Sequence, residues 1–323
     1  MAIMRVCGCF CLLFAALCAA QSPREVTFDG LRDSNPGATF DHGYVVAWDL
    51  VHVHSATLYD PEGRKMFDVT SFKLPDGTKT AAPMSVAVDT DGVSAFVYWG
   101  QQGTRSGIAI LDSAGNQLRV IQTEPYKPSQ VCFAPDHSIW MFGDQWKARR
   151  DLPVSDFMTF RHYSSDGKLL GSFVPRSALP AWEGEGLDQL VGPFVGLWRL
   201  RATRDRIGAA LRIAPYKHAW VELNLNGELI RQWIYTDSRN DSVIPSAFDS
   251  KGLLYGMHWI DEKRVGISVF DKSTSSWKPV SSLPSDFLIG ADGTRLVYQK
   301  GDTLRWFEGL NTELKESAAV SQP

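Results

Sequence analysis

The stretch GIAILD, residues 107–112, returns late in the chain as GISVFD, residues 266–271. Each is a short apolar run that leads into an aspartate, as a β-strand leads into a turn. The two stretches begin 159 positions apart, which is three repeats of 53 residues. Repeats of about this length are typical of arrays of small β-sheets. The pair therefore sets the register in which we read the rest of the chain.

The turn that follows this strand recurs along the sequence. It occurs as DPEG (60–63), DSAG (112–115), SSDG (164–167), NLNG (224–227) and DKST (271–274). Asp, Asn and Ser favour the first position because their side chains bond the local backbone, and Gly accepts a positive φ at the last. The pattern predicts a hairpin turn between two strands.

A second family of turns precedes the first in each repeat. Its members are residues 41–43, 89–92, 134–137, 203–206, 249–252 and 291–293. Two β-rich runs lie between the two turns of a repeat, for example Val93–Trp99 and Gly107–Asp112. His137 and Arg206 stand where the third and fourth repeats lack the expected glycine. Each complete repeat is predicted to be a four-stranded antiparallel meander, and there are six repeats.

Six meanders of about 50 residues predict an all-β fold, a six-bladed β-propeller of four-stranded antiparallel blades. A sandwich or barrel would not explain why the same two turns return in the same order, and no long run has the 3.6-residue period of helical repeats. The sixth repeat supplies only three strands, at residues 287–289, 295–298 and 303–308. The strand at residues 25–30 is expected to join this last blade and close the ring.

The chain resembles the six-bladed propellers of the broad NHL and TolB-like group over residues 25–310. The resemblance rests on one Asp-Gly turn and one Asp-x-x-Gly turn per repeat, such as Asp91-Gly92 and DSAG at 112–115. These motifs are architectural. The resemblance implies the propeller fold and no particular activity.

The first twenty residues have the features of a secretory signal peptide. Arg5 precedes an uncharged run, Val6–Leu17, that is too short to cross a bilayer, and small residues end at Ala20. A lipoprotein signal is the alternative, but Cys18 follows Leu17 rather than a small residue. We expect a signal peptide (1–20), a single propeller domain (21–310) and a polar tail (311–323), and a secreted or periplasmic protein.

Composition narrows the class of protein further. The 323 residues are 44% hydrophobic, which allows a large core and excludes a disordered chain. Four of the five cysteines precede residue 20, so Cys132 is left alone and is expected to be a buried, inert thiol. A net charge of −3 gives no reason to expect a nucleic-acid partner. No membrane span is expected, and we expect a monomer.

Ligands of propellers usually lie where the loops between second and third strands, and between blades, gather around the channel. Both turn families belong to the opposite face and are set aside. Loops 143–157, 180–194 and 259–264 exceed the needs of the repeat, as binding loops often do. With loop 214–218 they supply the predicted ligand-binding residues Trp146, Lys147, Arg149, Arg150, Trp182, Lys217, Trp259 and Arg264. In the other interpretation, these cations form a solvated rim and these tryptophans pack between blades, so that they bind no ligand.

Catalytic and metal-binding residues can also be nominated. The candidates for acid–base chemistry are Glu183, Glu185 and Asp188. Acidic loop residues are usually solvated, and sequence cannot show the separation that a catalytic pair needs. His52 and His54 lie on one face of an extended chain and could bind a metal if His218 or His258 completed the site. No nucleophile elbow or phosphate-binding loop is present, and no cofactor is expected.

Two functions therefore remain open. The first is a secreted, noncatalytic propeller that binds a protein or an extended ligand through its loop face. The second is a hydrolase or lyase that acts on a carbohydrate-like or anionic substrate at the mouth of the channel.

Overall fold

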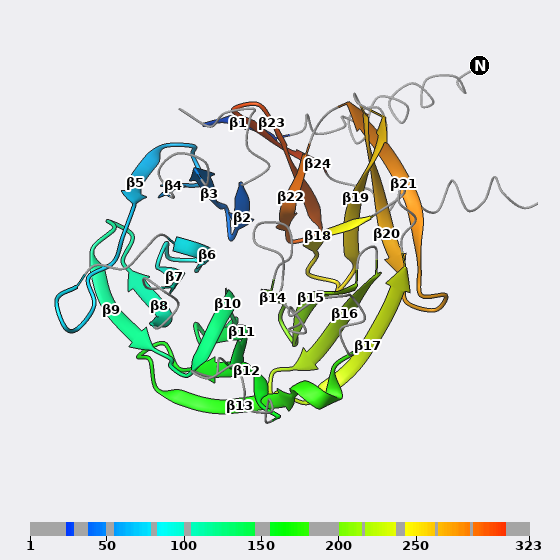
Figure 1. Ribbon diagram of the computed structural model, residues 1–323. Helices are drawn as coiled ribbons and strands as arrows, with labels where there is room; N and C mark the ends of the chain where they lie inside the picture. The colour runs from blue at the N-terminus through cyan, green and yellow to red at the C-terminus, as the bar shows by residue number, and fades with distance from the viewer. Residues whose placement is uncertain are drawn as a thin grey trace, which may run out of the picture.

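A computed structural model describes a ring of β-sheets around a central channel (Figure 1). The described residues are 24–28, 38–49, 55–78, 83–99, 105–145, 156–180, 200–214, 217–236, 243–261, 264–284 and 287–307. Within them, the strands form six four-stranded antiparallel sheets, and a short 3-10 turn, Arg176–Ala178, follows the third. The predicted all-β, six-bladed propeller is confirmed.

Each blade runs from an innermost to an outermost strand. Blade 1 contains β2 (Thr39–Asp41), β3 (Tyr44–Asp49), β4 (Ser55–Tyr59) and β5 (Lys65–Val69). Blade 2 contains β6 (Pro83–Val88), β7 (Ser94–Trp99), β8 (Ser106–Leu111) and β9 (Gln117–Gln122). Blade 3 contains β10 (Tyr126–Phe133), β11 (Ile139–Gln145), β12 (Met158–Tyr163) and β13 (Leu169–Pro175).

The second half of the ring repeats this order. Blade 4 contains β14 (Leu200–Ala202), β15 (Arg206–Ala214), β16 (Lys217–Asn224) and β17 (Leu229–Thr236). Blade 5 contains β18 (Ile244–Phe248), β19 (Leu254–Asp261), β20 (Arg264–Asp271) and β21 (Ser276–Pro284). Blade 6 contains β22 (Phe287–Asp292), β23 (Arg295–Lys300), β24 (Thr303–Phe307) and β1 (Arg24–Thr27).

The core lies between the blades. Six apolar clusters are described, and each joins two blades that are neighbours in the ring. Middle strands such as β8 are buried along their whole length because a neighbouring blade covers each face of their sheet. This explains why such strands read as continuous apolar runs in the sequence. Large aromatics fill the interfaces, with Trp140, Trp220 and Trp306 all buried.

The recurring turns have the predicted geometry. Asp112 accepts hydrogen bonds from the backbone N–H groups of Ala114 and Asn116, at 2.9 and 2.8 Å, and Gly115 has a φ of +84°. Where the third blade lacks the glycine, His137 itself adopts a φ of +64°. The His137 ring then bonds Asp89 of blade 2 at 2.6 Å. The residue that replaces the glycine, His137, therefore makes a contact between two blades.

The N-terminal strand closes the ring, as predicted. Strand β1 pairs antiparallel with β24, with Val26 opposite Leu304, and completes blade 6. Phe28 follows β1 and is fully buried, and its N–H donates to the Asp302 carbonyl at 2.7 Å. Its ring meets Tyr59 of blade 1 edge to face, with centroids 5.6 Å apart. The closing segment thus joins blade 6 to blade 1 through backbone and side chain.

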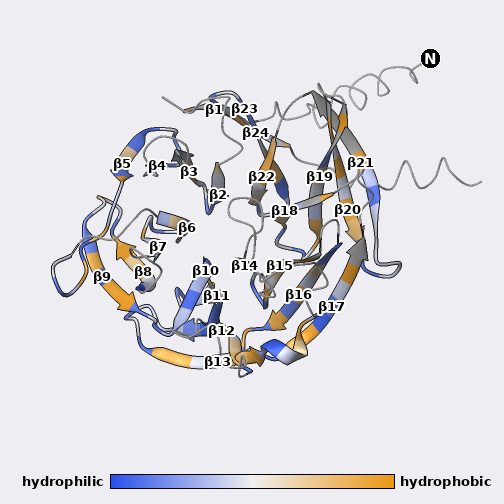
Figure 2. Cartoon of the chain, viewed as in Figure 1, coloured by the Kyte–Doolittle hydropathy of each residue, from blue (hydrophilic) through white to orange (hydrophobic). Residues whose placement is uncertain are grey.

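The outermost strands leave some apolar side chains in solvent. Figure 2 shows hydrophobic residues on β9, β13 and β17 at the outer rim, where Leu118, Leu170 and Ile230 are exposed. An outermost strand has no further strand beside it, so this exposure follows from its place in the blade. No helix in the described part of the chain is long and apolar enough to cross a membrane.

Truncation of the closing segment tests the ring. Phe28→Ala should reduce the free energy of unfolding by about 3 to 5 kcal/mol, because it leaves a cavity between blades 6 and 1. Leu118→Ala, on the exposed part of β9, is the control and should change it by less than about 0.5 kcal/mol. Both values come from urea denaturation followed by fluorescence. Equal, small effects would show that residues 24–28 do not close the ring.

Candidate functional site

The two ends of the channel have different connections. Both turn families lie at one end, which we name the turn face, and the remaining connections lie at the other, the loop face. The loops that are predicted to bind a ligand connect strand ends that lie at the loop face.

Most of the predicted site residues lie outside the described residues. These are Trp146, Lys147, Arg149, Arg150, Trp182, Glu183, Glu185, Asp188, His52 and His54. Trp259 and Arg264 lie on β19 and β20, where the structure describes only their backbone. Lys217 is half-buried at the start of β16, and His218 beside it is buried. These residues therefore remain predictions.

The described edge of the loop face carries a small polar cluster. Lys127, at the start of β10, holds its Nζ 3.8 Å from the centroid of the Trp99 ring at the end of β7. Trp99 Nε1 donates to the Pro128 carbonyl at 2.8 Å. Asp144 lies opposite Lys127 in the β10–β11 register. Burial raises the pKa of Asp144 to about 6, although Lys127 acts in the opposite direction. We name Trp99, Lys127 and Asp144 the loop-face cluster.

A cavity of about 360 Å³ occupies the mouth of the channel on the turn face. All six blades line it, through the ends of their innermost strands and the turns that follow. Its charged lining residues are Asp41, His42, Arg201, Arg204, Asp249 and Asp292. We name this cavity the turn-face mouth. Its size is in the range of small-molecule sites.

Arg201 crosses the channel inside this mouth. It lies on β14 of blade 4, yet its NH2 donates to the Phe40 carbonyl of blade 1 at 2.9 Å. Its NH1 lies 3.5 Å from Asp41 Oδ1, and both side chains are largely buried. Blades 1 and 4 are opposite each other in the ring (Figure 1). One guanidinium group therefore links opposite sides of the propeller.

His42 meets the same carboxylate from the other side. Its Nδ1 lies 3.2 Å from Asp41 Oδ1 and 2.8 Å from the Val88 carbonyl of blade 2. The hydrogen bond with Asp41 raises the pKa of His42 to about 9, against the effect of burial. Burial opposes ionisation of Asp41, but Arg201, His42 and the Val88 N–H outweigh it and lower its pKa. Both side chains are therefore charged at neutral pH.

The turn-face mouth also contains a thiol and a buried acid. Cys132 is a buried free thiol, as predicted, and burial raises its pKa strongly. Asp249 is fully buried, and its Oδ1 accepts the N–H groups of Lys251 and Leu253 at 2.9 and 2.8 Å. Burial raises the pKa of Asp249, although its hydrogen bonds with Leu253, Lys251 and Tyr255 act in the opposite direction.

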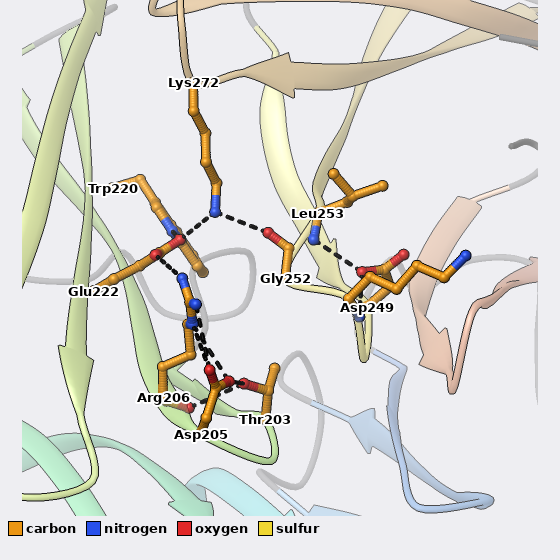
Figure 3. Close-up of polar contacts among 10 residues, drawn as sticks. Thr203, Asp205, Arg206, Trp220, Glu222, Asp249, Gly252, Leu253 and Lys272 are labelled. Carbon is orange, nitrogen blue, oxygen red and sulfur yellow. Dashed lines mark hydrogen bonds and ion pairs between the residues drawn. The ribbon is translucent and has the colours of Figure 1, made fainter. Parts of the chain in front are cut away.

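A cluster of charged residues around the buried Glu222 joins a turn of blade 4 to a turn of blade 5 (Figure 3). Glu222 on β16 is 1% exposed and accepts from Lys272 at 2.7 Å and from Arg206 at 3.1 Å. Trp220 Nε1 also donates to Glu222, at 3.0 Å. Lys272 in addition donates to the Gly252 carbonyl at 2.9 Å. Glu222 therefore fixes the blade 4 turn that contains Arg206 against the blade 5 turn that contains Gly252.

The described residues do not assemble a metal site. No group of three or more His, Cys, Asp or Glu side chains that could hold a metal ion occurs among them. The metal ligands predicted at His52 and His54 lie outside this part of the chain.

Comparisons with known proteins find only distant structural similarity. No protein-family model matches the chain, and no curated protein does. Among solved structures, it is similar to the propeller of Dos1, with 12% identity and a TM-score of 0.43 over 84% of this chain and 69% of the other. It is also similar to the propeller domain of the trilobed protease from Pyrococcus furiosus, with 12% identity and a TM-score of 0.46 over 88% and 95%.

A third similar structure is a protein from Lactobacillus plantarum, with 12% identity and a TM-score of 0.42 over 86% of this chain and 71% of that one. Similarity at this level concerns the fold alone. The six four-stranded sheets are the architecture that the resemblance to NHL and TolB-like propellers implies.

The residues of the turn-face mouth were not nominated from the sequence. Asp41 and His42 were assigned to a turn and set aside with it. One signal in the sequence could have pointed to Arg201, because it is a charged residue between the apolar residues Leu200 and Ala202 of a strand. His42 gives a weaker signal: it lies next to Gly43 in the turn, and the structure shows that its own φ is +48°. A buried charge requires a partner. The sequence does not show that the partner is Asp41, on the opposite blade.

Titration of His42 tests the contact with Asp41. In NMR spectra its imidazole should titrate near pH 9, and Asp41→Asn should lower that pKa, since the hydrogen bond and the charge of Asp41 that raise it are lost while burial still opposes the charged form. His137, whose pKa Asp89 raises, is the internal control and should not respond. Because the folded-state pKa is raised, this contact should stabilise the fold below pH 6.5 and be lost as pH rises through 9. A His42 pKa near 6.5 in the wild type would contradict the geometry.

Removal of Glu222 tests the ion cluster. Glu222→Ala should lower the free energy of unfolding by about 3 to 5 kcal/mol, because it leaves Lys272 and Arg206 without their buried partner. Glu62→Ala removes an exposed carboxylate that pairs with Arg64 and should cost no more than about 1 kcal/mol. Chemical denaturation gives both values, and a Glu222→Ala loss as small as that of Glu62→Ala would refute the structural role.

Proposed function

We propose that the protein is a noncatalytic binding propeller that holds a protein segment or another extended ligand at its loop face. The loop-face cluster is the observation that supports this. It places a half-buried tryptophan ring, a lysine and a carboxyl group at the ends of β7, β10 and β11. Strand β11 ends at Gln145, directly before the predicted binding residues Trp146, Lys147, Arg149 and Arg150.

The chemistry of the cluster suits an extended polar chain. A flat ring offers apolar contact, and Lys127 offers three N–H donors beside it. With a pKa of about 6, Asp144 is mainly ionised at neutral pH and can accept a hydrogen bond from a backbone amide or a hydroxyl. Trp182, Lys217, Trp259 and Arg264 would extend this surface around the channel.

The described groups argue against catalysis at the turn-face mouth. His42 is protonated at neutral pH and so cannot accept a proton as a general base. Cys132 is protonated and buried, and so cannot act as a nucleophile. The alternative function, a hydrolase or lyase, would use Glu183, Glu185 and Asp188, which lie outside the described residues.

The proposal includes an exported, monomeric protein. Residues 1–20 would direct it out of the cytoplasm, and removal of this segment near Ala20 would leave a secreted or periplasmic protein. The slight negative charge suits a protein or carbohydrate partner better than nucleic acid.

A peptide selection tests the proposal. A phage-displayed library of random peptides is selected on the immobilised protein, and selected peptides are measured by isothermal titration. Their dissociation constants should rise at least tenfold for Lys127→Met and for Trp146→Ala. Lys168→Met, an exposed lysine in a turn of the same blade but on the turn face, is the matched control and should leave them unchanged.

Two results would contradict the proposal. Peptides that bind all three variants as they bind the wild type would place the binding surface elsewhere. Failure to select any binder, from the peptide library or from a parallel screen of oligosaccharides, would remove the basis for an extended ligand at this face.

A further inference from the structure

The turn-face mouth carries a charge imbalance that the proposed function does not use. His42 and Arg201 both lie against a single oxygen, Asp41 Oδ1. One carboxylate therefore serves two cations. Arg204, on the exposed side of the mouth, adds a third positive charge.

The remaining acids of the mouth do not restore the balance. Asp292 is paired with Arg295 at 3.1 Å. Asp249 adds one carboxylate to Asp41, and the two together face the three cations His42, Arg201 and Arg204. Asp89, beyond the mouth, is paired with His137 at 2.6 Å. The mouth thus keeps an excess of positive charge around Asp41, and a second anion would balance it.

The two cations also have donors left to offer. His42 uses Nδ1 with Asp41 and Val88, and its Nε2 has no partner among the described residues. Arg201 contacts Asp41 through Nη1 and the Phe40 carbonyl through Nη2. Its Nε has no partner among the described residues. A guanidinium and an imidazolium that share one carboxylate are well placed to share a second anion.

A buried acceptor lies on the blade 5 side of the same cavity. Asp249 is fully buried and lines the mouth, and among the described residues its Oδ2 has no donor at ordinary hydrogen-bond geometry, although the Tyr255 hydroxyl lies beside the carboxyl group. Buried polar atoms are rarely left in this state in a folded protein. A hydroxyl or amine on the ligand would satisfy it.

From these contacts we propose that the turn-face mouth binds a small organic anion, a carboxylate or a phosphate monoester, between Arg201 and His42. The cavity of about 360 Å³ has room for such a ligand, and every turn around it is among the described residues. This site lies at the opposite end of the channel from the loop-face cluster. It is therefore independent of the proposed function.

Titration with two probes tests this site. Glycerate and glycerol 3-phosphate, which share a hydroxylated carbon chain, are titrated into the wild-type protein at constant ionic strength by isothermal calorimetry. Saturable binding of either probe is expected, and the tighter of the two identifies the anionic group. In parallel, the probe that binds should shift the His42 imidazole signals in NMR spectra and leave those of His137 unchanged.

Variants locate the binding. Arg201→Lys keeps the charge but loses the forked donor, and His42→Asn loses the imidazolium while Asn tolerates the positive φ at this position. Each should raise the dissociation constant at least tenfold. Arg64→Gln, which removes an exposed arginine that pairs with Asp60 and does not line the mouth, should not change it. Lack of saturable binding of both probes to the wild type would overturn the proposal. Binding that both mouth variants retain would overturn it as well.

Discussion

Packing six sheets around one axis buries both faces of each blade, and the same geometry keeps the innermost strands apart at the axis. The gap has to be filled by side chains or left as a channel. On the turn face, Arg201 reaches from blade 4 to Asp41 and the Phe40 carbonyl on blade 1. This contact spans the gap and gives the mouth its charge.

The supporting contacts explain why that mouth has a defined shape. Glu222 holds a turn of blade 4 against a turn of blade 5, and His137 with Asp89 does the same for blades 3 and 2. Both contacts join blades through charged hydrogen bonds that are shielded from water on at least one side. The two ends of the channel therefore differ, because one is built from tight turns and the other from longer connections. A small anion suits the first, and an extended ligand suits the second.

The sequence predicts the fold because its signals are local. The aspartate and glycine of DSAG at 112–115 specify a turn without help from distant residues, and the apolar strand at 25–30 lacks a blade of its own. The mouth could not be predicted in this way. Arg201 and Asp41 are 160 positions apart and meet only because blades 1 and 4 are opposite in a closed ring. The predicted binding residues near Trp146 remain predictions, since they lie outside the described residues.

The central claim is that Arg201 and Asp41 interact across the channel, and a double-mutant cycle measures this directly. Free energies of unfolding are determined for the wild type, Arg201→Met, Asp41→Asn and the double variant. For a largely buried charged pair we expect a coupling energy of about 1 to 3 kcal/mol. A coupling energy within about 0.3 kcal/mol of zero would show that the two residues do not interact across the channel, and would contradict the account of the turn-face mouth.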